Sequence, residues 1–317
     1  MNDSAPNAIE ARATARPDSL VRTISRSGSV AVKAIVASEL VAEALSRRPF
    51  APTAAHALGR TMLGALLIAV GSAPDDADEA NVESVQLQLR GDGPLGSLTA
   101  IADSRGRVRG TVAHPEIELA HADGTPNLSA AVGFGPLNVV RHRPRWRSPY
   151  TGTVPIVSGE IARDLTLYLT ESEQVPSAMG LAVALGPGMG DVAACGFLVQ
   201  SLPDATDEDL AQMEDNVASF SDLAGRLESP VEASSLVDEL LLGLGAREHH
   251  RMQPTFHCPC SHERARRTLA LLEVEELESL VAHAESQEIV CDFCGGTYRV
   301  GPQEIATLLE SSRNARA

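Results

Sequence analysis

The chain has 317 residues, of which 44% are hydrophobic, so it can build one large globular domain and a smaller one. Asp and Glu outnumber Lys and Arg by 42 to 26, and the formal charge of −16 disfavours general binding to nucleic acids. The first 17 residues contain no apolar stretch of the kind that a secretory signal requires, so we expect a cytoplasmic protein with reduced cysteines.

A disordered tail is expected over residues 1–17, because Asn, Ala, Ser and Pro dominate this segment without periodicity. Ordered structure is expected from Asp18 onward. The β-branched residues over 30–36 predict a strand, and residues 37–45 favour a helix that Pro49 brings to an end.

A second helix is predicted over residues 53–70, where small side chains permit close packing against neighbours. Its apolar run of about fourteen residues is shorter than the roughly 20 that are needed to cross a bilayer. The segment therefore predicts a buried core helix and no membrane span.

Residues 85–90 alternate between apolar and polar side chains and predict a half-buried strand, which follows an acidic loop, residues 75–79. The Gly-rich segment 91–96 comes next. A phosphate-binding loop would need a Gly-Lys-Ser/Thr or dinucleotide-binding motif, which this segment lacks, so a turn is the preferred interpretation.

Several short strands and a helix over 160–170 are expected in the rest of the N-terminal part. The strand candidates are 98–102, 108–113, 137–140, 154–157 and 181–185. Because they follow no regular βαβ order, the fold class is predicted to be α+β, with a mixed sheet and packed helices over residues 18–204. The basic and aromatic segment 141–147 is interpreted as a solvated loop.

Residues 205–256 predict a helical linker whose stability is conditional, because they hold eleven Asp and Glu against three Arg, and three glycines weaken the helices. Thr206 to Asp209 can cap a first helix, and Ser229-Pro230-Val231-Glu232 offers a capping box for a second. The segment can fold only by burying an apolar stripe on a neighbour. This stripe consists of Leu210, Met213, Val217 and Phe220.

Two cysteine pairs mark a small C-terminal domain, residues 257–317. Cys258 and Cys260 form one pair and Cys291 and Cys294 the other, and four thiolates are the ligands that a tetrahedral Zn²⁺ requires. Gly295 and Gly296 allow positive φ and let backbone N–H groups turn toward the sulfurs. The short Cys-Pro-Cys spacing also favours a small, strained disulfide if the metal leaves, which indicates a site that changes state.

Simpler interpretations of these cysteines stay open. One is a zinc ribbon that only stabilises the fold. Another, less favoured because the cysteine count is odd, is a set of secreted disulfides. His257, His262 and His283 could bind metal as well, but four thiolates already complete the coordination shell, so these histidines are expected to be exposed.

The cysteine pairs, with Phe256 and Tyr298 beside them, resemble those of the 33-kilodalton redox-regulated heat-shock chaperone family. The N-terminal segments that share the resemblance are Gly91-Asp92-Gly93-Pro94-Leu95, Val108-Arg109-Gly110, Gly159-Glu160-Ile161 and Ser172-Glu173-Gln174. The likeness extends from Asp18 onward. It implies an ATP-independent holdase, not an enzyme, that binds one Zn²⁺ per chain in an inactive, reduced state.

The resemblance further implies that oxidation releases zinc and joins Cys258 to Cys260 and Cys291 to Cys294. The linker then unfolds, the chain forms a homodimer, and exposed apolar residues hold unfolded client proteins. The candidates for client contact are Leu210, Met213, Val217 and Phe220. Cys195 stands where the family commonly has glycine, and it is expected to be an inert residue of a buried strand.

Two other functions compete with the chaperone. A thiol oxidoreductase would use Cys291 and Cys294, but such a pair normally opens a helix after a strand, whereas Gly295 and Gly296 break a helix at once. A zinc-ribbon adaptor for nucleic acid or protein is the other. Residues 257–317 hold ten acidic and six basic side chains, so binding to nucleic acid would lack its electrostatic attraction.

Overall fold

The computed structural model describes residues 17–71, 82–284 and 286–316. Contacts divide the chain into two compact units, and the division falls between His257 and Cys258. The expected tail, residues 1–17, lies outside the described residues apart from Pro17, and the expected acidic loop, residues 75–79, lies outside them entirely.

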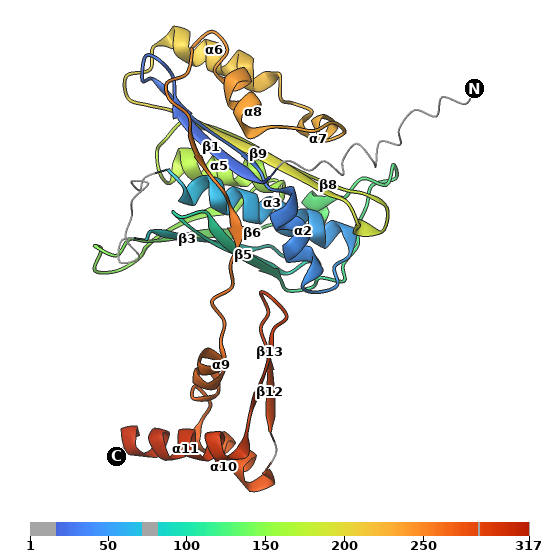
Figure 1. The fold of residues 1–317 in the computed structure, drawn as a ribbon, viewed down its shortest axis with the longest axis vertical. Helices are drawn as coiled ribbons and strands as arrows, with labels where there is room; N and C mark the ends of the chain where they lie inside the picture. Colours follow the sequence, from blue (N-terminus) through green and yellow to red (C-terminus); the bar gives the residue numbers. More distant parts are fainter. Residues whose placement is uncertain (1–16, 72–81, 285, 317) are drawn as a thin grey trace, which may run out of the picture. The chain divides into compact units, whose positions relative to one another are not determined.

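The first unit contains two β-sheets, which confirms the α+β fold class (Figure 1). One sheet is antiparallel and has the order β10-β1-β2-β9-β8. Its strands are β1 (Ser19–Ile24), β2 (Val30–Val36), β8 (Ser177–Leu185), β9 (Val192–Ser201) and β10 (His250–Met252).

The second sheet has the order β11-β5-β4-β3-β6-β7 and is mixed, because β11 runs parallel to β5. Its strands are β3 (Ser84–Arg90), β4 (Ser97–Asp103), β5 (Arg107–Val112), β6 (Gly135–His142), β7 (Tyr150–Ile156) and β11 (Thr255–Phe256). The strands expected over 30–36, 85–90, 98–102, 108–113, 137–140, 154–157 and 181–185 therefore all exist, several of them longer than predicted. β1, β10 and β11 were not predicted as strands.

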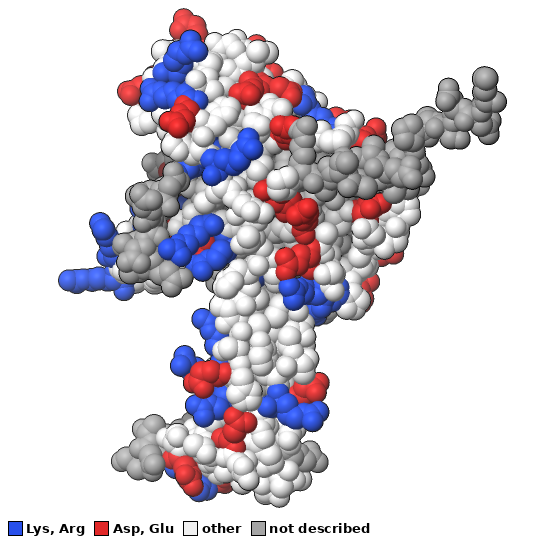
Figure 2. Space-filling model, viewed as in Figure 1, with Lys and Arg blue, Asp and Glu red and all other residues white. Residues whose placement is uncertain are grey.

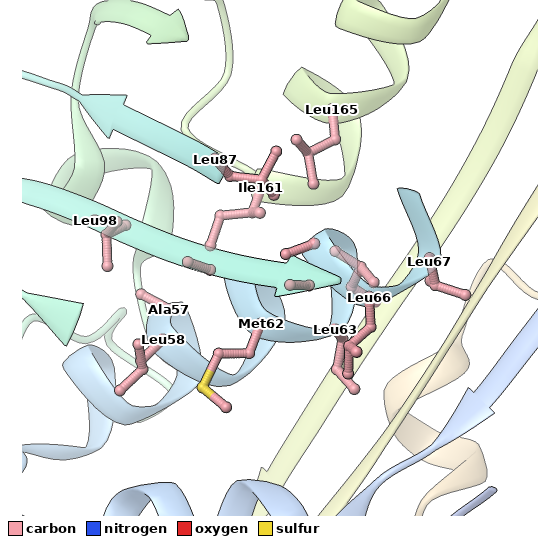
Figure 3. Close-up of a cluster of buried hydrophobic side chains, with 14 of the residues drawn as sticks. Ala57, Leu58, Met62, Leu63, Leu66, Leu67, Leu87, Leu98, Ile161 and Leu165 are labelled. Atoms are coloured by element: carbon pink, nitrogen blue, oxygen red, sulfur yellow. The ribbon is translucent and has the colours of Figure 1, made fainter. Parts of the chain in front are cut away.

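Four helices belong to the core of this unit: α2 (Ser38–Ser46), α3 (Pro52–Ala69), α4 (Leu128–Val132) and α5 (Ile161–Glu171). α3 contacts strands of both sheets and is buried on nearly every side. Figure 3 shows Met62 and Leu66 of this helix among Leu87 and Leu98 of the second sheet and Leu165 of α5. The predicted buried core helix is confirmed.

A membrane-crossing helix needs both length and a sustained apolar stretch. No helix in the described ranges meets both conditions.

The Gly-rich segment 91–96 is a turn, as predicted. The N–H groups of Asp92, Gly93 and Leu95 donate to the carbonyl oxygens of Phe134, Val132 and Ala131, at 2.8, 3.0 and 3.0 Å. A Cβ atom on Gly91 would overlap the carbonyl oxygen of Val132, so the two backbones approach closely only because this residue is glycine. These donors are already occupied and do not form a phosphate cradle.

Helices from the predicted linker cover one face of the first sheet (Figure 1). They are α6 (Asp207–Ala218), α7 (Leu223–Arg226) and α8 (Ala233–Leu240). Phe220, after α6, meets Phe197 of β9 edge to face, with ring centroids 5.2 Å apart. Leu236, Val237 and Leu240 of α8 are buried in the same cluster. The linker thus hides its apolar side chains on the sheet.

The start of α6 follows the prediction, because Thr206 and Asp209 form a reciprocal capping box. The second predicted capping box is wrong. Residues 229–232 lie outside a helix, and α8 begins at Ala233 after an extended Glu232 that makes no side-chain cap. Burial of the i, i+3, i+4, i+7 positions of α8 determines where the helix begins, since it aligns these residues with the sheet.

The end of the predicted linker is extended and not helical. β10 pairs with β1, and β11 pairs with β5, so residues 250–256 add one strand to each sheet. β11 is held further by the guanidinium of Arg47, which lies 5.5 Å from the ring centroid of Phe256. The pairing of β10 with β1 joins residues more than 200 positions apart, and neither pairing could be predicted from local sequence patterns.

The expected solvated loop over 141–147 is partly wrong. Arg141 lies in β6, and its guanidinium donates to both carboxylate oxygens of Glu173, at 2.6 and 2.9 Å. Glu173 also accepts a hydrogen bond from the hydroxyl of the buried Tyr168. Arg143 stacks on Trp146 at 4.7 Å, and this part of the segment does form an exposed loop. Ion pairing with a half-buried carboxylate withdraws Arg141 from solvent.

Burial of Lys33 in β2 shifts the pKa of its side chain, and this shift can be tested. Its Nζ donates to the carbonyl oxygen of Leu67 at 3.1 Å, near the C-terminal end of α3, where helix carbonyls lack partners within the helix. Burial, with a smaller contribution from Arg141, lowers the pKa of Lys33 from 10.5 to about 8. Between these two pH values the folded chain therefore binds fewer protons than the unfolded chain, so stability contributed by this group rises with pH.

We expect the free energy of unfolding of the parent to rise by about 1 to 2 kcal/mol from pH 8 to pH 10, relative to a Lys33→Met variant. Denaturant titrations of both proteins at several pH values measure this difference. Tyrosines and cysteines that titrate in the same range contribute equally to both proteins, so their contributions cancel in the difference between the two free energies of unfolding. Parallel stability curves for the two proteins would contradict the assignment.

The second unit contains α9 (His262–Leu269), α10 (Val274–His283), the antiparallel strands β12 (Gln287–Val290) and β13 (Thr297–Val300), and α11 (Pro302–Arg316). Between the cysteine pairs, where residues 263–284 predict one or two helices, the structure has two, whereas the hairpin and α11 were not predicted. The buried core of this unit is small and consists of Leu269, Leu277, Val300, Ile305, Leu308 and Leu309.

Candidate metal centre

The second cysteine pair lies in the turn between β12 and β13. Residues Val290 and Thr297 pair across the hairpin, and the N–H of Cys291 donates to the carbonyl oxygen of Gly296 at 2.9 Å. Gly295 has a φ of 68°, and its N–H returns to the carbonyl oxygen of Cys291 at 2.8 Å. The positive φ agrees with the prediction, although it is the N–H of Gly296, and not that of Gly295, that bonds to the Cys294 sulfur.

The first cysteine pair lies just before α9. Ser261 caps this helix, because its side chain accepts a hydrogen bond from the N–H of Arg264. The helix therefore starts directly after Cys260 and leaves the Cys258-Pro259-Cys260 segment non-helical. Its two thiols are half-buried, as are the two thiols of the hairpin.

All four sulfurs lie within 4.8 Å of one another. Contacts cross between the pairs, with Cys258 Sγ 3.7 Å from Cys291 Sγ and Cys260 Sγ 3.2 Å from Cys294 Sγ. In a tetrahedral zinc site with Zn–S bonds of about 2.3 Å, sulfurs lie about 3.8 Å apart. The four thiols are therefore positioned to hold one metal ion, and this is the only such group of His, Cys, Asp or Glu in the described part of the chain.

The electrostatics of the group fit a cation. Burial raises the pKa of Cys294 to about 12, the N–H of Gly296 opposes this shift, and hydrogen bonds with the other three thiols add to it. Four adjacent thiols cannot all ionise unless a positive charge compensates them. A divalent ion at the centre would supply that charge and stabilise the thiolates.

Tyr298 of β13 completes the surroundings of the sulfurs. Its hydroxyl donates to Cys260 Sγ, with oxygen and sulfur 2.9 Å apart. This hydrogen bond is the main reason that the pKa of Tyr298 is raised to about 12, followed by burial. From the sequence, Tyr298 was predicted only to lie near the cysteines; its position four residues after Cys294 was the signal that could have placed it here.

The other residues considered from the sequence are not part of the group of four. His257, His262 and His283 are exposed, as expected, and His262 pairs with Glu304 at 2.8 Å. Cys195 lies in β9, fully buried, and burial raises its pKa to about 12. The predicted place in a buried strand is confirmed, and a buried thiol of raised pKa is expected to be inert in the folded chain.

The four residues proposed for client contact come together on the linker. Met213 and Phe220 are buried against the first sheet, and Leu210 and Val217 are partly buried against the same cluster. In this folded state none of them presents an open apolar surface.

Comparisons with known proteins agree on one relationship. Residues 18–301 match the family described as Hsp33 protein. The chain is 40% identical over 290 residues to the 33 kDa chaperonin of Symbiobacterium thermophilum, covering 91% of this chain and 96% of that one. It is 37% identical to the 33 kDa chaperonin of Thermus thermophilus over 306 residues, covering 93% and 87%.

A solved structure is similar as well. The crystal structure of the 33 kDa chaperonin from Thermotoga maritima superposes with a TM-score of 0.83 at 28% identity, covering 94% of this chain and 100% of that one.

Proposed function

Because the chain belongs to the Hsp33 family of chaperones, we propose that it is a redox-regulated, ATP-independent holdase for unfolded proteins under oxidative stress. The observation that carries this proposal is the gathering of Cys258, Cys260, Cys291 and Cys294 around one point. The proposed ion is Zn²⁺, one per chain, since it prefers four soft thiolates in a tetrahedral arrangement. The reduced, zinc-bound chain is the inactive state.

Oxidation of the sulfurs removes the ligands. A peroxide converts one thiolate to a sulfenic acid, and a neighbouring thiolate then displaces hydroxide from it to form a disulfide. The proposed pairs are Cys258 with Cys260 and Cys291 with Cys294. When bound, the ion holds the four thiolates together and stabilises residues 258–317. Each disulfide removes two of its ligands and thereby lowers the stability of that unit.

The linker of residues 205–256 is the proposed second part of the switch. β11 ends at Phe256, two residues before Cys258, so the strand that anchors the end of the linker is adjacent in sequence to a metal ligand. Its pairing with β5 spans only two residues. Unfolding of residues 258–317 frees the chain beyond this short strand, and the acidic linker then separates from the sheet.

An opened linker offers apolar side chains to clients. Leu210, Met213, Val217 and Phe220 leave the cluster that covers the first sheet, and the sheet face beneath them is uncovered too. Flexible Leu, Met and Phe side chains adapt to varied unfolded sequences. The same exposed surface supports the proposed homodimer of the oxidised chain.

The proposal places the protein in the cytoplasm and gives it neither a nucleic-acid nor a membrane partner. On the face of residues 18–257 that Figure 2 shows, Lys and Arg lie in small groups among Asp and Glu and form no extended basic tract. Binding to phosphate backbones would need such a tract, and the net charge of −16 opposes it. A zinc-ribbon adaptor for nucleic acid is therefore the weaker alternative.

A function as a thiol oxidoreductase is likewise less well supported than the chaperone function. Cys291 and Cys294 lie in a hairpin turn and not at the start of a helix, and the pKa of Cys294 is raised instead of lowered. A catalytic thiol needs a lowered pKa. We propose that the chain is not an enzyme, and reduction of insulin by the chain would contradict this.

Light scattering by a thermally unfolding client tests the function without ATP. The reduced parent is expected to leave aggregation unchanged, and the peroxide-treated parent is expected to suppress it at about one chain per client. A Cys258→Ser, Cys260→Ser variant is expected to lose the dependence on peroxide, while Cys195→Ala keeps it. Peroxide dependence in the double variant that equals that of the parent would contradict the thiol switch.

A further inference from the structure

We propose that Tyr298 is a positioning residue that protects the thiolate of Cys260 from oxidants and thereby sets how fast peroxide releases the metal. The hydroxyl of Tyr298 would act through the sulfur and touch neither the oxidant nor the client. This inference rests on the proposed function, because it concerns the regulation of the same site.

The geometry that supports the inference is specific to one sulfur. The Tyr298 hydroxyl lies 2.9 Å from Cys260 Sγ and donates a hydrogen bond to this sulfur. The ring that carries the hydroxyl is on β13 and is half-buried. β13 pairs with β12 through Tyr298 opposite Ile289, so the hairpin holds the ring in place. A side chain at position 298 therefore points at the sulfurs because of the register of the hairpin.

The ring also lies close to the turn that carries the second cysteine pair. A Cβ atom on Gly296 would meet Cys294 Sγ at 3.3 Å and the Tyr298 hydroxyl at 3.6 Å. Glycine at this position thus leaves the space between ring and sulfur that lets both approach.

The charge of the site explains why a donor matters. Four thiolates around one divalent cation carry a net charge of −2, and oxidants attack the exposed lone pairs of these sulfurs. A hydrogen bond occupies a lone pair and withdraws charge from the sulfur. The sulfur is then a weaker nucleophile, and the donor also fixes its position in the site. Cys260 receives such a bond from Tyr298, and Cys294 receives one from the N–H of Gly296.

The affected reaction is the first oxidation of Cys260. Its thiolate attacks one oxygen of a peroxide, the O–O bond breaks, hydroxide leaves, and a sulfenic acid remains on the sulfur. A second thiolate then attacks this sulfur, an S–S bond forms, and a second hydroxide leaves. The peroxide is the oxidant and is reduced, and the two sulfurs are oxidised together.

Tyr298→Phe tests the role of the hydroxyl, because it keeps the ring. The zinc-loaded variant is expected to release zinc to a chromogenic chelator roughly threefold to tenfold faster than the parent in hydrogen peroxide. Mass spectrometry with a sulfenic-acid trap is expected to show the same acceleration at Cys260. Tyr150→Phe, which removes an exposed hydroxyl far from the cysteines in sequence, is the matched control and should behave as the parent does.

Tyr298→Leu separates the hydroxyl from the ring. Equal acceleration in the Phe and Leu variants supports the hydrogen bond, whereas acceleration in the Leu variant alone would assign protection to the ring and overturn the proposal. A Phe variant whose Cys260 is trapped at the parental rate would also overturn it. Trapping at Cys260 is measured on the full chain after addition of zinc, so weaker metal binding in a variant does not prevent the comparison.

These measurements can contradict the role of Tyr298 and the proposed function separately. If peroxide releases zinc from the parent without activating it as a chaperone, the proposed function is wrong and the role of Tyr298 is unaffected. If peroxide activates the parent but Tyr298→Phe reacts at the parental rate, only the role of Tyr298 is wrong.

Discussion

Replacing both Cys291 and Cys294 with serine is expected to abolish metal binding and unfold residues 258–317, which frees the linker of residues 205–256, while residues 18–204 stay folded. Serine hydroxyls are poor ligands for a soft, thiolate-binding ion, so only two of four ligands remain. Structural zinc contributes on the order of 10 to 16 kcal/mol to the folding of small zinc modules. The six residues of the hydrophobic cluster in this unit cannot replace a contribution of that size.

Metal analysis, hydrogen exchange and limited proteolysis measure this outcome on the full chain. Amides of α9, α10 and the hairpin should lose protection, and those of α3 and β9 should keep it. Cys195→Ala is the matched control, because it removes a cysteine that lies outside the group of four. A variant that loses its metal but keeps protected amides in β12 and β13 would show that the small core suffices.

A double substitution in α8, Leu236→Ala with Leu240→Ala, is expected to open the linker and activate the reduced, zinc-bound chain without oxidant. Both side chains are almost completely buried between the helix and the first sheet. Each substitution removes roughly 2 to 5 kcal/mol of packing free energy. A linker of conditional stability cannot remain docked after a loss of that size.

Cys195 reports on this opening directly. It is buried in β9 within the cluster that the linker covers, so its alkylation requires the linker to move. A loss of about 2 kcal/mol or more should raise its rate of alkylation at least about thirtyfold. Leu242→Ala, which truncates an exposed leucine just after α8, is the control and should leave both rate and activity unchanged.

The two measurements together decide what linker opening does. A variant that exposes Cys195 and suppresses client aggregation while it is reduced supports the proposed switch. A variant that exposes Cys195 and still needs peroxide for activity would separate linker opening from chaperone function.

Local sequence patterns predicted the elements whose residues carry their own signal. The alternation over 85–90 and the small, apolar residues of 53–70 identified β3 and α3, because periodicity reflects which side chains face a core. Thr206 and Asp209 identified the start of α6 by the chemistry of a capping box. The Cys-x-Cys and Cys-x-x-Cys spacings identified the metal centre, because short spacing brings two thiols of one segment together wherever the segment lies.

Contacts between distant segments were beyond local patterns. β10 pairs with β1 across more than 200 residues, and no periodicity in either segment specifies that pairing. The beginning of α8 followed the sheet against which it packs and not the capping residues at 229–232. Arg141, in a segment interpreted as a solvated loop, is withdrawn from solvent by Glu173.

The sequence by itself determined the chemistry of this protein: four thiols in two short pairs, an acidic linker with one apolar stripe, and enough small aliphatic residues for a core. Tertiary structure alone decided where that chemistry acts. It placed the stripe against the first sheet, the hydroxyl of Tyr298 against Cys260, and the end of the linker in a two-residue strand that ends two residues before Cys258 in the sequence. The physical reason is that residue type and spacing set what a group can do, whereas burial and pairing between distant segments set which neighbours it meets.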